Sequence, residues 1–336
     1  MLKKILFLFY LLTFNQSYAI EKVTAEQIEK LKTMENSKDR FLEYVKLPKA
    51  EAGKRANGSI NWVYYGTTIS VGDEATFKED LELSSYTFDN LDASGAIFNG
   101  GVFCTAVNFK NRAKFTGANF KGYLKLEGAQ FNGSADFSNC VFENTCDFVL
   151  TSFNNIVTFY NSIFAQKIYF HKTNFNQNTI FEKCIFKEVS DFLTTNFAFD
   201  LSFKGSIFQQ VAKFRFANFS KITDFSSCTF TQQADFFGAS FGVRANYANT
   251  TFSQEATFRW AKFNGSINFA NTIFAAFVNF KYSNLVDLGS NASFSGATYT
   301  SEENIKYIPQ MPPASVNYRA QMKKVEGQAA RESYAY

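Results

Sequence analysis

Phenylalanine recurs in this sequence with a fixed period, and that period constrains the fold more than any other feature. One series runs from Phe98 to Phe274 in steps of eleven residues and is Phe at every position. A second series runs from Phe115 to Phe280 with the same step and departs from Phe only at Leu126 and Tyr247. The interleaved spacings alternate between five and six residues, which is not a helical period, so we expect short extended segments.

Each extended segment is expected to send one large and one small side chain into the interior. The residue two positions before a Phe of the first series is nearly always small, as at Ala118, Cys140 and Thr151. Residues two apart point to the same side of an extended chain. The residue between them is mostly polar, as at Asn119 and Asp136, and is therefore predicted to point outward.

A segment of five or six residues cannot bury its own Phe, but stacked segments can, which is the logic of a solenoid. The distribution of proline supports stacking, because all four Pro residues (48, 309, 312 and 313) lie outside residues 75–300. A solenoid strand needs its backbone N–H for the ladder, and Pro has none.

Three segments show the repeat in its plainest form: residues 118–122 read ANFKG, residues 135–139 read ADFSN and residues 234–238 read ADFFG. They resemble the pentapeptide-repeat motif, A-D/N-L/F-x-x, and the resemblance covers about residues 75–300. It implies an all-β fold, a right-handed quadrilateral parallel β-helix with four units per coil. Here alternate sides have six residues, so a coil takes 22 residues and the rod is roughly 50 Å long at the usual strand spacing.

The first nineteen residues have the layout of a secretory signal peptide. Lys3 and Lys4 precede an apolar run from Ile5 to Phe14, and the small residue Ala19 ends a cleavage site. A membrane anchor would need about twenty apolar residues, roughly twice this run. We therefore expect cleavage after Ala19, export to the periplasm or beyond the cell, and no stable membrane insertion of the mature chain.

The flanks of the repeat are expected to differ from it. Residues 20–59 are predicted to hold a short helical segment over 24–46, which Thr24 and Gln27 would cap, and a linker over 48–58. The β-helix is assigned to residues 60–300, with 60–71 as a first irregular coil that covers the open end. Residues 301–336 are predicted to form a C-terminal tail with at most weak helix.

Cysteines occur in register with the repeat. Cys140, Cys184 and Cys228 are 44 residues apart, which places them two coils apart on one side. Their Cα atoms would be roughly 10 Å apart, beyond disulfide reach. These three are predicted to be buried free thiols at small core positions. Cys146 lies one unit after Cys140, and the spacing leaves a disulfide between those two open.

We identify no catalytic, cofactor-binding or metal-ligating residues. His171 is the only His, and the sequence has no zinc-ligand cluster, phosphate-binding glycine loop or nucleophile elbow. A β-helical polysaccharide-acting enzyme is an alternative, since repeated outward Asp residues resemble a glycosidase carboxylate pair. Such enzymes build a cleft from long loops, however, and the repeat has no insertion between Phe98 and Phe280. We therefore expect a non-enzymatic protein without a cofactor.

A second alternative comes from the resemblance, because some pentapeptide-repeat proteins mimic DNA and modulate type II topoisomerases. A DNA mimic needs a strongly acidic surface to compete for a site built for phosphates. Residues 75–300 contain 18 Lys and Arg and 17 Asp and Glu, a net charge of +1. This balance favours neither DNA mimicry nor nucleic-acid binding.

One side of the predicted β-helix differs from the other three, which carry mostly Asn, Gln, Ser, Gly, Thr and Lys in outward positions. On this side large apolar residues and cations follow the inward Phe residues, and such a composition is typical of binding surfaces. We name seven of its residues the aromatic strip and predict that they bind a partner: Arg215, Phe216, Phe237, Arg259, Trp260, Lys281 and Tyr282.

The aromatic strip is predicted to be covered in the working protein. Three covers are consistent with the sequence: an N- or C-terminal segment of the chain, a second copy in a homodimer, or a foreign partner. For a foreign partner, the cations beside the rings favour an acidic protein tail or an anionic envelope polymer, held by charge and by cation–π contacts. The sequence does not identify the partner further.

Overall fold

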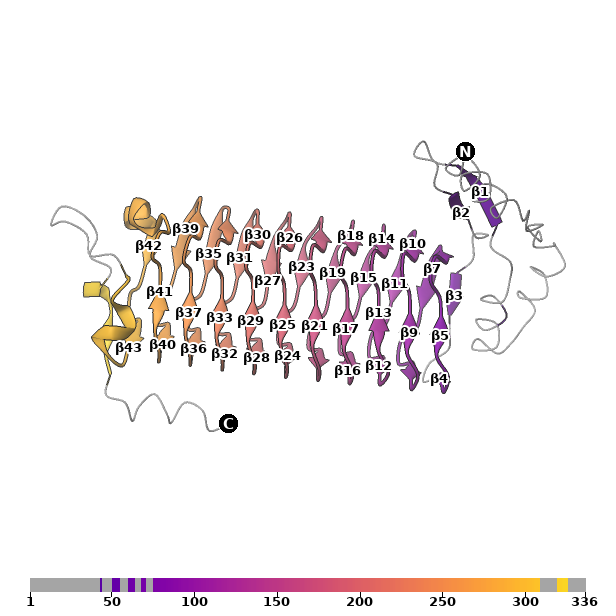
Figure 1. Ribbon diagram of the computed structural model, residues 1–336, viewed down its shortest axis with the longest axis horizontal. Coiled ribbons are helices and arrows are strands. Elements are labelled where there is room, and N and C mark those ends of the chain that lie inside the picture. The colour runs from indigo at the N-terminus through magenta and orange to yellow at the C-terminus, as the bar shows by residue number, and fades with distance from the viewer. Residues whose placement is uncertain are drawn as a thin grey trace, which may run out of the picture.

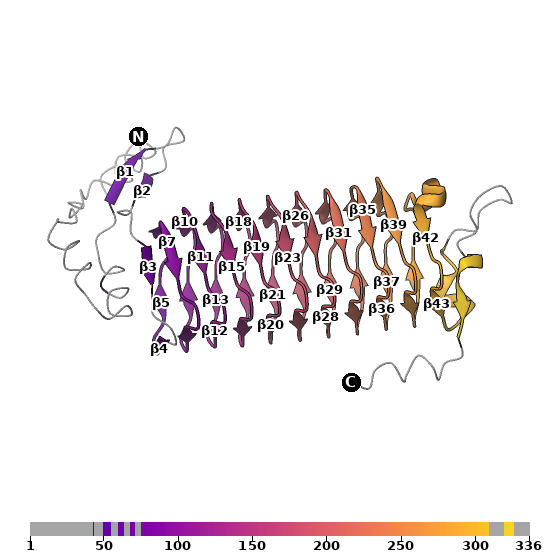
Figure 2. The same cartoon turned by 180° about the vertical axis from the view of Figure 1, so that it is seen from behind.

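The computed structural model describes residues 43, 50–54, 60–63, 68–70, 75–308 and 319–325. Over most of this length the chain winds as a parallel β-helix with four sides, which Figures 1 and 2 show as a long row of stacked strands. The predicted all-β quadrilateral parallel β-helix is therefore confirmed. We number its sheets I to IV in the order in which the chain passes through them.

Sheets I and II hold eleven and twelve strands, respectively. The strands of sheet I are β3 (Thr68–Ser70), β7 (Asn90–Asp92), β11 (Ala113–Lys114), β15 (Ala135–Asp136), β19 (Val157–Thr158), β23 (Thr179–Ile180), β27 (Leu201–Ser202), β31 (Ile222–Asp224), β35 (Arg244–Asn246), β39 (Ser266–Asn268) and β42 (Ala292–Ser293). Those of sheet II are β4 (Thr76–Phe77), β8 (Ile97–Phe98), β12 (Asn119–Phe120), β16 (Val141–Phe142), β20 (Ile163–Phe164), β24 (Ile185–Phe186), β28 (Ile207–Phe208), β32 (Thr229–Phe230), β36 (Thr251–Phe252), β40 (Ile273–Phe274), β43 (Thr298–Tyr299) and β44 (Lys323–Lys324).

Sheets III and IV hold ten and nine strands, respectively. The strands of sheet III are β5 (Leu81–Glu82), β9 (Val102–Phe103), β13 (Leu124–Lys125), β17 (Cys146–Asp147), β21 (Ile168–Tyr169), β25 (Ser190–Asp191), β29 (Ala212–Lys213), β33 (Ala234–Asp235), β37 (Ala256–Thr257) and β41 (Val278–Asn279). Those of sheet IV are β6 (Thr87–Phe88), β10 (Asn108–Phe109), β14 (Gln130–Phe131), β18 (Ser152–Phe153), β22 (Asn174–Phe175), β26 (Asn196–Phe197), β30 (Asn218–Phe219), β34 (Ser240–Phe241) and β38 (Lys262–Phe263).

The register of the sheets follows the phenylalanine period. Phe120 of β12 pairs with Phe142 of β16, and Phe142 pairs with Phe164 of β20, so that successive coils are 22 residues apart. The last coil is longer, because Phe274 of β40 pairs with Tyr299 of β43 and the 3-10 helix η1 (Leu285–Asn291) lies between them. The regular part of the stack therefore keeps every Phe directly above another.

The interior is a set of aromatic stacks. Phe159 and Phe181, for example, are parallel within 1° with ring centroids 4.6 Å apart, and both are fully buried. Rings from opposite sides meet edge to face, as Phe148 after sheet III and Phe159 after sheet I do at 86°. Offset stacks and edge-to-face pairs are the favoured arrangements of aromatic rings, each worth about 0.5–1.5 kcal/mol beyond burial.

Small residues of the repeat do more than leave room for the rings. Where the residue two before a Phe of the first series is Ser, Thr or Cys, its side chain donates to a carbonyl oxygen 25 residues earlier, as Thr195 Oγ1 does to Phe170 at 2.7 Å. Cys184 Sγ makes the same contact with the carbonyl of Phe159 at 3.0 Å. All five Cys are free and buried, as predicted for three of them, and Cys140 and Cys146 form no disulfide.

The ends of the β-helix require two corrections. Residues 48–58 were assigned to a linker, but β1 (Ala50–Lys54) lies there and pairs antiparallel with β2 (Ile60–Val63), which was assigned to the first coil. The sequence does not predict this strand, because Ala, Glu, Gly and Lys all have low strand propensity. The strand forms here through its pairing with β2. Among the described residues of the predicted irregular coil, Thr68–Ser70 join the stack, in sheet I. Most of the predicted helix over 24–46 lies outside the described residues.

The predicted C-terminal tail is in part a cap. Ile305, in the 3-10 helix η2 (Glu302–Ile305), and Ile308 are almost fully buried against the last coil. A further 3-10 turn, η3 (Arg319–Gln321), precedes β44, which extends sheet II by pairing with β43. An open solenoid end exposes unpaired strand edges, and this segment covers one of them.

Candidate functional site

The aromatic strip lies at the corner where the chain leaves sheet III and enters sheet IV, which we call corner III–IV. Each coil contributes two outward residues there, directly after the inward Phe. Arg215, Phe237, Arg259 and Lys281 occupy the first place, and Phe216, Trp260 and Tyr282 the second. The register of sheet III brings all seven into one row along the rod.

Side chains at the second place are well exposed. Phe216 is 53% exposed, and Trp260 and Tyr282 are each 52% exposed. Leu150, at the same place three coils before Phe216, is 50% exposed and belongs to this row although we did not include it in the strip. The described residues thus leave the rings of the strip in solvent.

The backbone at the second place is left-handed, with φ of 54° at Phe216, 61° at Trp260 and 65° at Tyr282. The Cβ of an L-residue approaches the carbonyl oxygen in this conformation, at a cost of roughly 1–2 kcal/mol that Gly avoids and Asn reduces. Leu150 and the β-branched Thr194 adopt it at this corner too, with φ of 59° and 54°. Bulky residues with positive φ are genuine outliers.

The corner between sheets I and II makes the same turn and provides an internal comparison. Eight of its ten left-handed residues are Gly or Asn, namely Gly95, Gly117, Asn139, Asn161, Gly205, Asn249, Asn271 and Gly296, beside Lys183 and Ser227. At corner III–IV only two of ten are, Gly128 and Gly238, beside Ser85, Ala106, Leu150, Lys172, Thr194, Phe216, Trp260 and Tyr282. Gly and Asn, which suit the turn, thus prevail at one corner, whereas at the other they are mostly replaced, at four of the ten places by a large apolar or aromatic residue.

Carboxylates of sheet III hold the corner in place. Asp235 Oδ1 accepts the backbone N–H of Phe237 at 3.0 Å, and Asp191 Oδ1 accepts that of Leu193 at 3.1 Å. Asn279 supports Lys281 in the same way at 2.9 Å. These polar residues were predicted only to point outward, but their acceptor oxygens also fix the direction in which the strip residues leave the backbone.

The middle of the strip is electrically neutralised. Arg215 Nε lies 3.6 Å from Asp235 Oδ2, and its guanidinium lies 4.8 Å from the ring centroid of Phe237. Phe216 meets the same ring edge to face at 5.5 Å. Burial raises the pKa of Asp235, although the N–H of Phe237 and the charge of Arg215 act in the opposite direction. Arg215 is therefore committed to a partner within the chain.

An open groove of about 440 Å³ lies beside this neutralised part, over the outer face of sheet III. Asp191 is nearly buried at its edge, 2.9 Å from His171 Nε2 and 3.6 Å from Lys213 Nζ. Sequence reasoning missed this contact because it considered His171 alone. Alternation along β25 and β29 places both Asp191 and Lys213 outward and was the signal that could have found it.

The C-terminal part of the strip keeps its charge. Within the described residues, neither Arg259 nor Lys281 has an ion-pair partner, while both lie over the ring of Tyr282, at 5.4 and 4.8 Å from its centroid. Trp260 lies 4.8 Å from the same ring. The ring of Tyr307, in the C-terminal cap, lies beside these residues, with its centroid 5.8 Å from Lys281 Nζ. The four strip residues here form one exposed cluster of rings and cations.

One expectation about the strip is wrong. Large apolar residues are not confined to this side, because Ile156, Phe199 and Val243 are exposed at the corner between sheets IV and I, and Ile207 is exposed on sheet II. They escaped notice because each stands singly among polar residues in the coil pattern. Contacts between rings and cations gather at corner III–IV, as described for Tyr282 and Phe237, whereas the corner between sheets I and II has the single contact of Lys183 with Tyr160 among the described residues.

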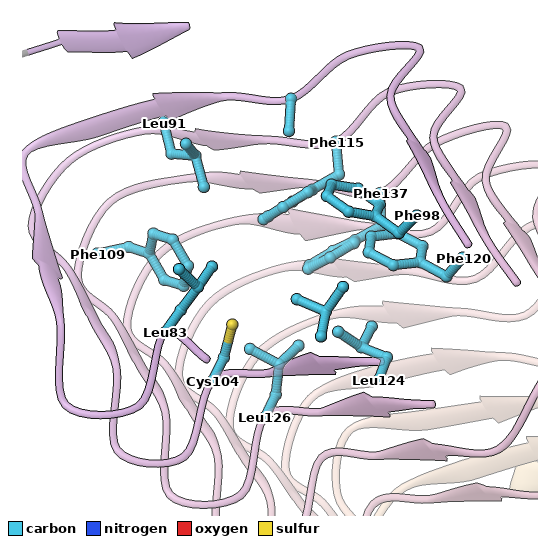
Figure 3. A pocket seen from close by; sticks show the side chains of 12 residues that line it. Leu83, Leu91, Phe98, Cys104, Phe109, Phe115, Phe120, Leu124, Leu126 and Phe137 are labelled. Carbon is cyan, nitrogen blue, oxygen red and sulfur yellow. The ribbon is translucent and has the colours of Figure 1, made fainter. Parts of the chain in front are cut away.

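An internal cavity lies near the N-terminal end of the core, where the inward residues are Leu83, Ala93 and Cys104 in place of Phe (Figure 3). Its volume is about 20 Å³ and its walls are apolar, so it offers a water molecule no hydrogen-bond partner. The cavity is a packing defect caused by the missing rings and is too small for a ligand.

The described residues contain no group of three or more His, Cys, Asp or Glu side chains suited to hold a metal ion. No helix in the described part of the chain has both the length and the apolar character needed to cross a bilayer.

Comparison with known proteins agrees with the repeat. Residues 105–163 match the family described as pentapeptide repeats (9 copies). HetL, a pentapeptide repeat protein involved in heterocyst differentiation regulation from the cyanobacterium Nostoc sp. strain PCC 7120, is 13% identical in a structural alignment with a TM-score of 0.22. The alignment covers 67% of this chain and 89% of HetL. No curated protein matches the chain.

The matched segment spans nearly three coils, and the same 22-residue register continues from β12 to β40 on sheet II without interruption. The A-D/N-F pattern has a structural counterpart: the small residue is buried, the Phe stacks, and on sheets I and III the Asp or Asn accepts a backbone N–H of the following turn, as Asp136 and Asp235 do. Residues 105–163 therefore match the pentapeptide-repeat family, and the rest of the β-helix continues the same repeat.

Proposed function

We propose that this protein is an exported, non-enzymatic scaffold that binds a foreign partner through the aromatic strip. The observation that carries the proposal is the contrast between the two left-handed corners. At corner III–IV, Leu150, Phe216, Trp260 and Tyr282 stand where the opposite corner has Gly or Asn. Residues in strained conformations persist where the side chain serves a function, and a binding role explains why large exposed side chains are placed there.

Packing within the chain accounts for only part of the use of large residues at the left-handed positions of corner III–IV. The contact of Trp260 with Tyr282 offsets some of the strain at those two residues. Leu150 and Phe216 are half exposed, and Phe216 meets only Phe237 among the ring pairs. An exposed strip of rings and cations has the composition of a binding hot spot. The same strip is basic, which is opposite in sign to the surface that a DNA mimic needs.

Site-specific photo-crosslinking in the producing cell tests the binding role. A photoreactive phenylalanine analogue replaces Phe216 in one variant and Phe199 in a matched control, since Phe199 is also exposed but lies at the corner between sheets IV and I. We expect a discrete adduct from position 216 and none from position 199. An adduct with the mass of a dimer would assign the strip to self-association instead, and equal labelling at both positions would remove the strip as a binding site.

The export part of the proposal has its own test, which is the intact mass of the protein recovered from the producing cell. We expect a mature chain that begins at Ile20, since the signal-like segment ends at Ala19. A mass that retains the first nineteen residues would contradict export by this route.

A further inference from the structure

The C-terminal part of the aromatic strip differs from the middle in a way that specifies the chemistry of a ligand. In the middle, Asp235 neutralises Arg215 and Asp191 faces Lys213. One and two coils beyond Asp235, the corresponding outward residues of sheet III are Thr257 and Asn279, which carry no charge. The cations at this end therefore face neutral neighbours on their own sheet.

Two of the acidic side chains near this end have partners of their own. Glu255 accepts a hydrogen bond from Gln233 at 3.3 Å, and Glu303 of the C-terminal cap pairs with Lys306. A further exposed cation, Lys262, follows on β38 of sheet IV. Arg259, Lys281 and Lys262 thus form a positively charged end of the strip that no described carboxylate neutralises.

The rings at this end form a flat apolar surface beside the charge. Trp260 and Tyr282 lie one coil apart with centroids 4.8 Å apart and planes inclined by 30°, and both are about half exposed. Arg259 and Lys281 flank the ring of Tyr282. A ligand that fits must present a flat face of weakly polarised C–H groups to the rings and an anionic group to the cations.

The backbone at the corner is not available for recognition. The N–H of Phe258 donates to the carbonyl of Asn279, and the N–H of Trp260 donates to that of Lys281. An extended peptide laid along this row therefore cannot add as a strand and would lose the main-chain hydrogen bonds that give such complexes their affinity. A sugar polymer needs no backbone partner, because its ring faces stack on aromatic side chains and its carboxylates meet the cations.

We infer that Arg259, Trp260, Lys281 and Tyr282 bind an anionic polysaccharide, one whose sugar rings carry carboxylates. This inference rests on the proposed function and names the partner class of the same strip. Trp260 and Tyr282 supply the stacking surface, while Arg259 and Lys281 supply the charge. The polymer lies along the rod, so that consecutive sugars meet consecutive coils.

Affinity electrophoresis of the mature protein tests the inference with polygalacturonate as the probe. We expect wild-type protein to be retarded at low salt, and the retardation to weaken as salt screens the charges. The same polymer with its carboxylates methyl-esterified is expected to retard the protein at least about tenfold less, because it keeps the sugar faces and loses the anions. No retardation by polygalacturonate would overturn the inference.

Matched variants locate the site. Arg259→Ala and Trp260→Ala are each expected to weaken binding by about tenfold, whereas Trp260→Phe should retain most of it. Lys183→Ala is the control, since Lys183 also lies over an aromatic ring, that of Tyr160, but at the corner between sheets I and II. An equal loss in Lys183→Ala would show that any exposed cation of the rod attracts the polymer and would contradict the assignment to the strip.

Polyglutamate supplies the peptide arm of the test. Equal retardation by polyglutamate and polygalacturonate would show attraction to any polyanion, and stronger retardation by polyglutamate would favour an acidic protein; either outcome would overturn the sugar assignment. The crosslink from position 216 remains the separate test of the binding role. A discrete adduct there without polysaccharide binding would leave the proposed function standing and remove only this inference.

Discussion

Thr173 donates a hydrogen bond of 2.6 Å from its hydroxyl to the carbonyl oxygen of Phe148, which lies 25 residues earlier in the chain. The hydroxyl is fully buried, and the contact joins one coil to the one before it. Equivalent bonds recur wherever Ser, Thr or Cys occupies this place, as at Thr195 and Cys184. They explain why the small residue of the repeat is so often polar in a core that is otherwise aromatic.

The contribution of this bond can be isolated with Thr173→Val, which keeps the volume and removes the donor. We expect a loss of about 1 kcal/mol in the free energy of unfolding, measured by urea denaturation, because one acceptor site on the Phe148 carbonyl goes unused. Ala239 occupies the equivalent place without a hydroxyl, and Ala239→Ser is expected to be neutral or slightly stabilising. A neutral Thr173→Val would show that the bond adds nothing to stability.

Removing a stacked ring is expected to cost more. Phe186 is fully buried between Phe164 and Phe208, at centroid distances of 4.9 and 4.6 Å. Phe186→Ala should lower the free energy of unfolding by about 3–5 kcal/mol, because a cavity replaces the ring. Phe216→Ala makes the same chemical change at an exposed position and should stay within about 0.5 kcal/mol of wild type. A cost below about 1 kcal/mol at Phe186 would contradict a close-packed core.

Tyr247 is the one departure from Phe in the second series that adds a polar atom to the core. It is fully buried and stacked between Phe225 and Phe269 at 5.0 and 5.1 Å, and its hydroxyl has no hydrogen-bond partner in the described structure. Burial raises the pKa of this hydroxyl. An unsatisfied buried hydroxyl costs roughly 1–3 kcal/mol, so Tyr247→Phe should stabilise the protein by about 1 kcal/mol or more. Phe236→Tyr is the reciprocal change and should destabilise it.

The sequence was sufficient to predict the coil, because a period of 22 residues with Phe inward leaves one arrangement in which every ring is buried. Phe120, Phe142 and Phe164 could be placed above one another from their spacing alone, and the register agrees. The direction of each outward residue followed from alternation. That was enough to bring the strip residues from Arg215 to Tyr282 onto one corner.

The features that the sequence could not predict depend on atomic positions and not on the spacing of the repeat. The positive φ of Phe216 and Trp260 is invisible in a pattern, since large residues there contradict the turn preference that would have revealed it. The division of the strip into neutral and charged parts depends on the 3.6 Å between Arg215 and Asp235. The hairpin of β1 and β2 arises from a pairing between two segments that have no period to identify them.

The buried thiols make a prediction about reactivity and pH. Burial raises the pKa of Cys184 to about 12, although its hydrogen bond to the backbone near Ser162 acts in the opposite direction, and burial raises the pKa of the other four Cys as well. Since the thiolate is the reactive form, we expect no alkylation of native protein by iodoacetamide at pH 8. All five Cys should react after unfolding in urea. Rapid labelling of the native protein would contradict the buried positions.

The raised pKa values of the buried thiols also determine how the stability of the protein changes with pH. A thiol whose folded pKa lies above its unfolded value of 9.0 contributes its full share of stability below that value. That share is lost as pH rises toward the folded pKa, because the unfolded chain releases the proton first. We therefore expect thermal stability to fall above about pH 9, and to fall less in a Cys184→Ser variant. An identical alkaline decline in this variant would assign the effect to other groups.

The conformational cost of corner III–IV can be measured with a residue that does not belong to the aromatic strip. Thr194 has φ of 54° at this corner, where its branched Cβ makes the left-handed conformation expensive. Thr194→Gly should raise the free energy of unfolding by about 0.5–1 kcal/mol, because relief of the strain exceeds the backbone entropy that Gly loses.

Asn161 is the matched position at the corner between sheets I and II, with φ of 56°, and its amide also donates to Asn139 at 2.9 Å. Asn161→Gly should bring no gain, because Asn already tolerates the left-handed region and the amide contact is lost. A difference between the two variants would show that corner III–IV carries side chains that its own turn disfavours, which is the premise of the binding proposal. Equal effects, or a loss of stability in Thr194→Gly, would mean that the turn itself accepts such residues and would leave the aromatic strip without its main support.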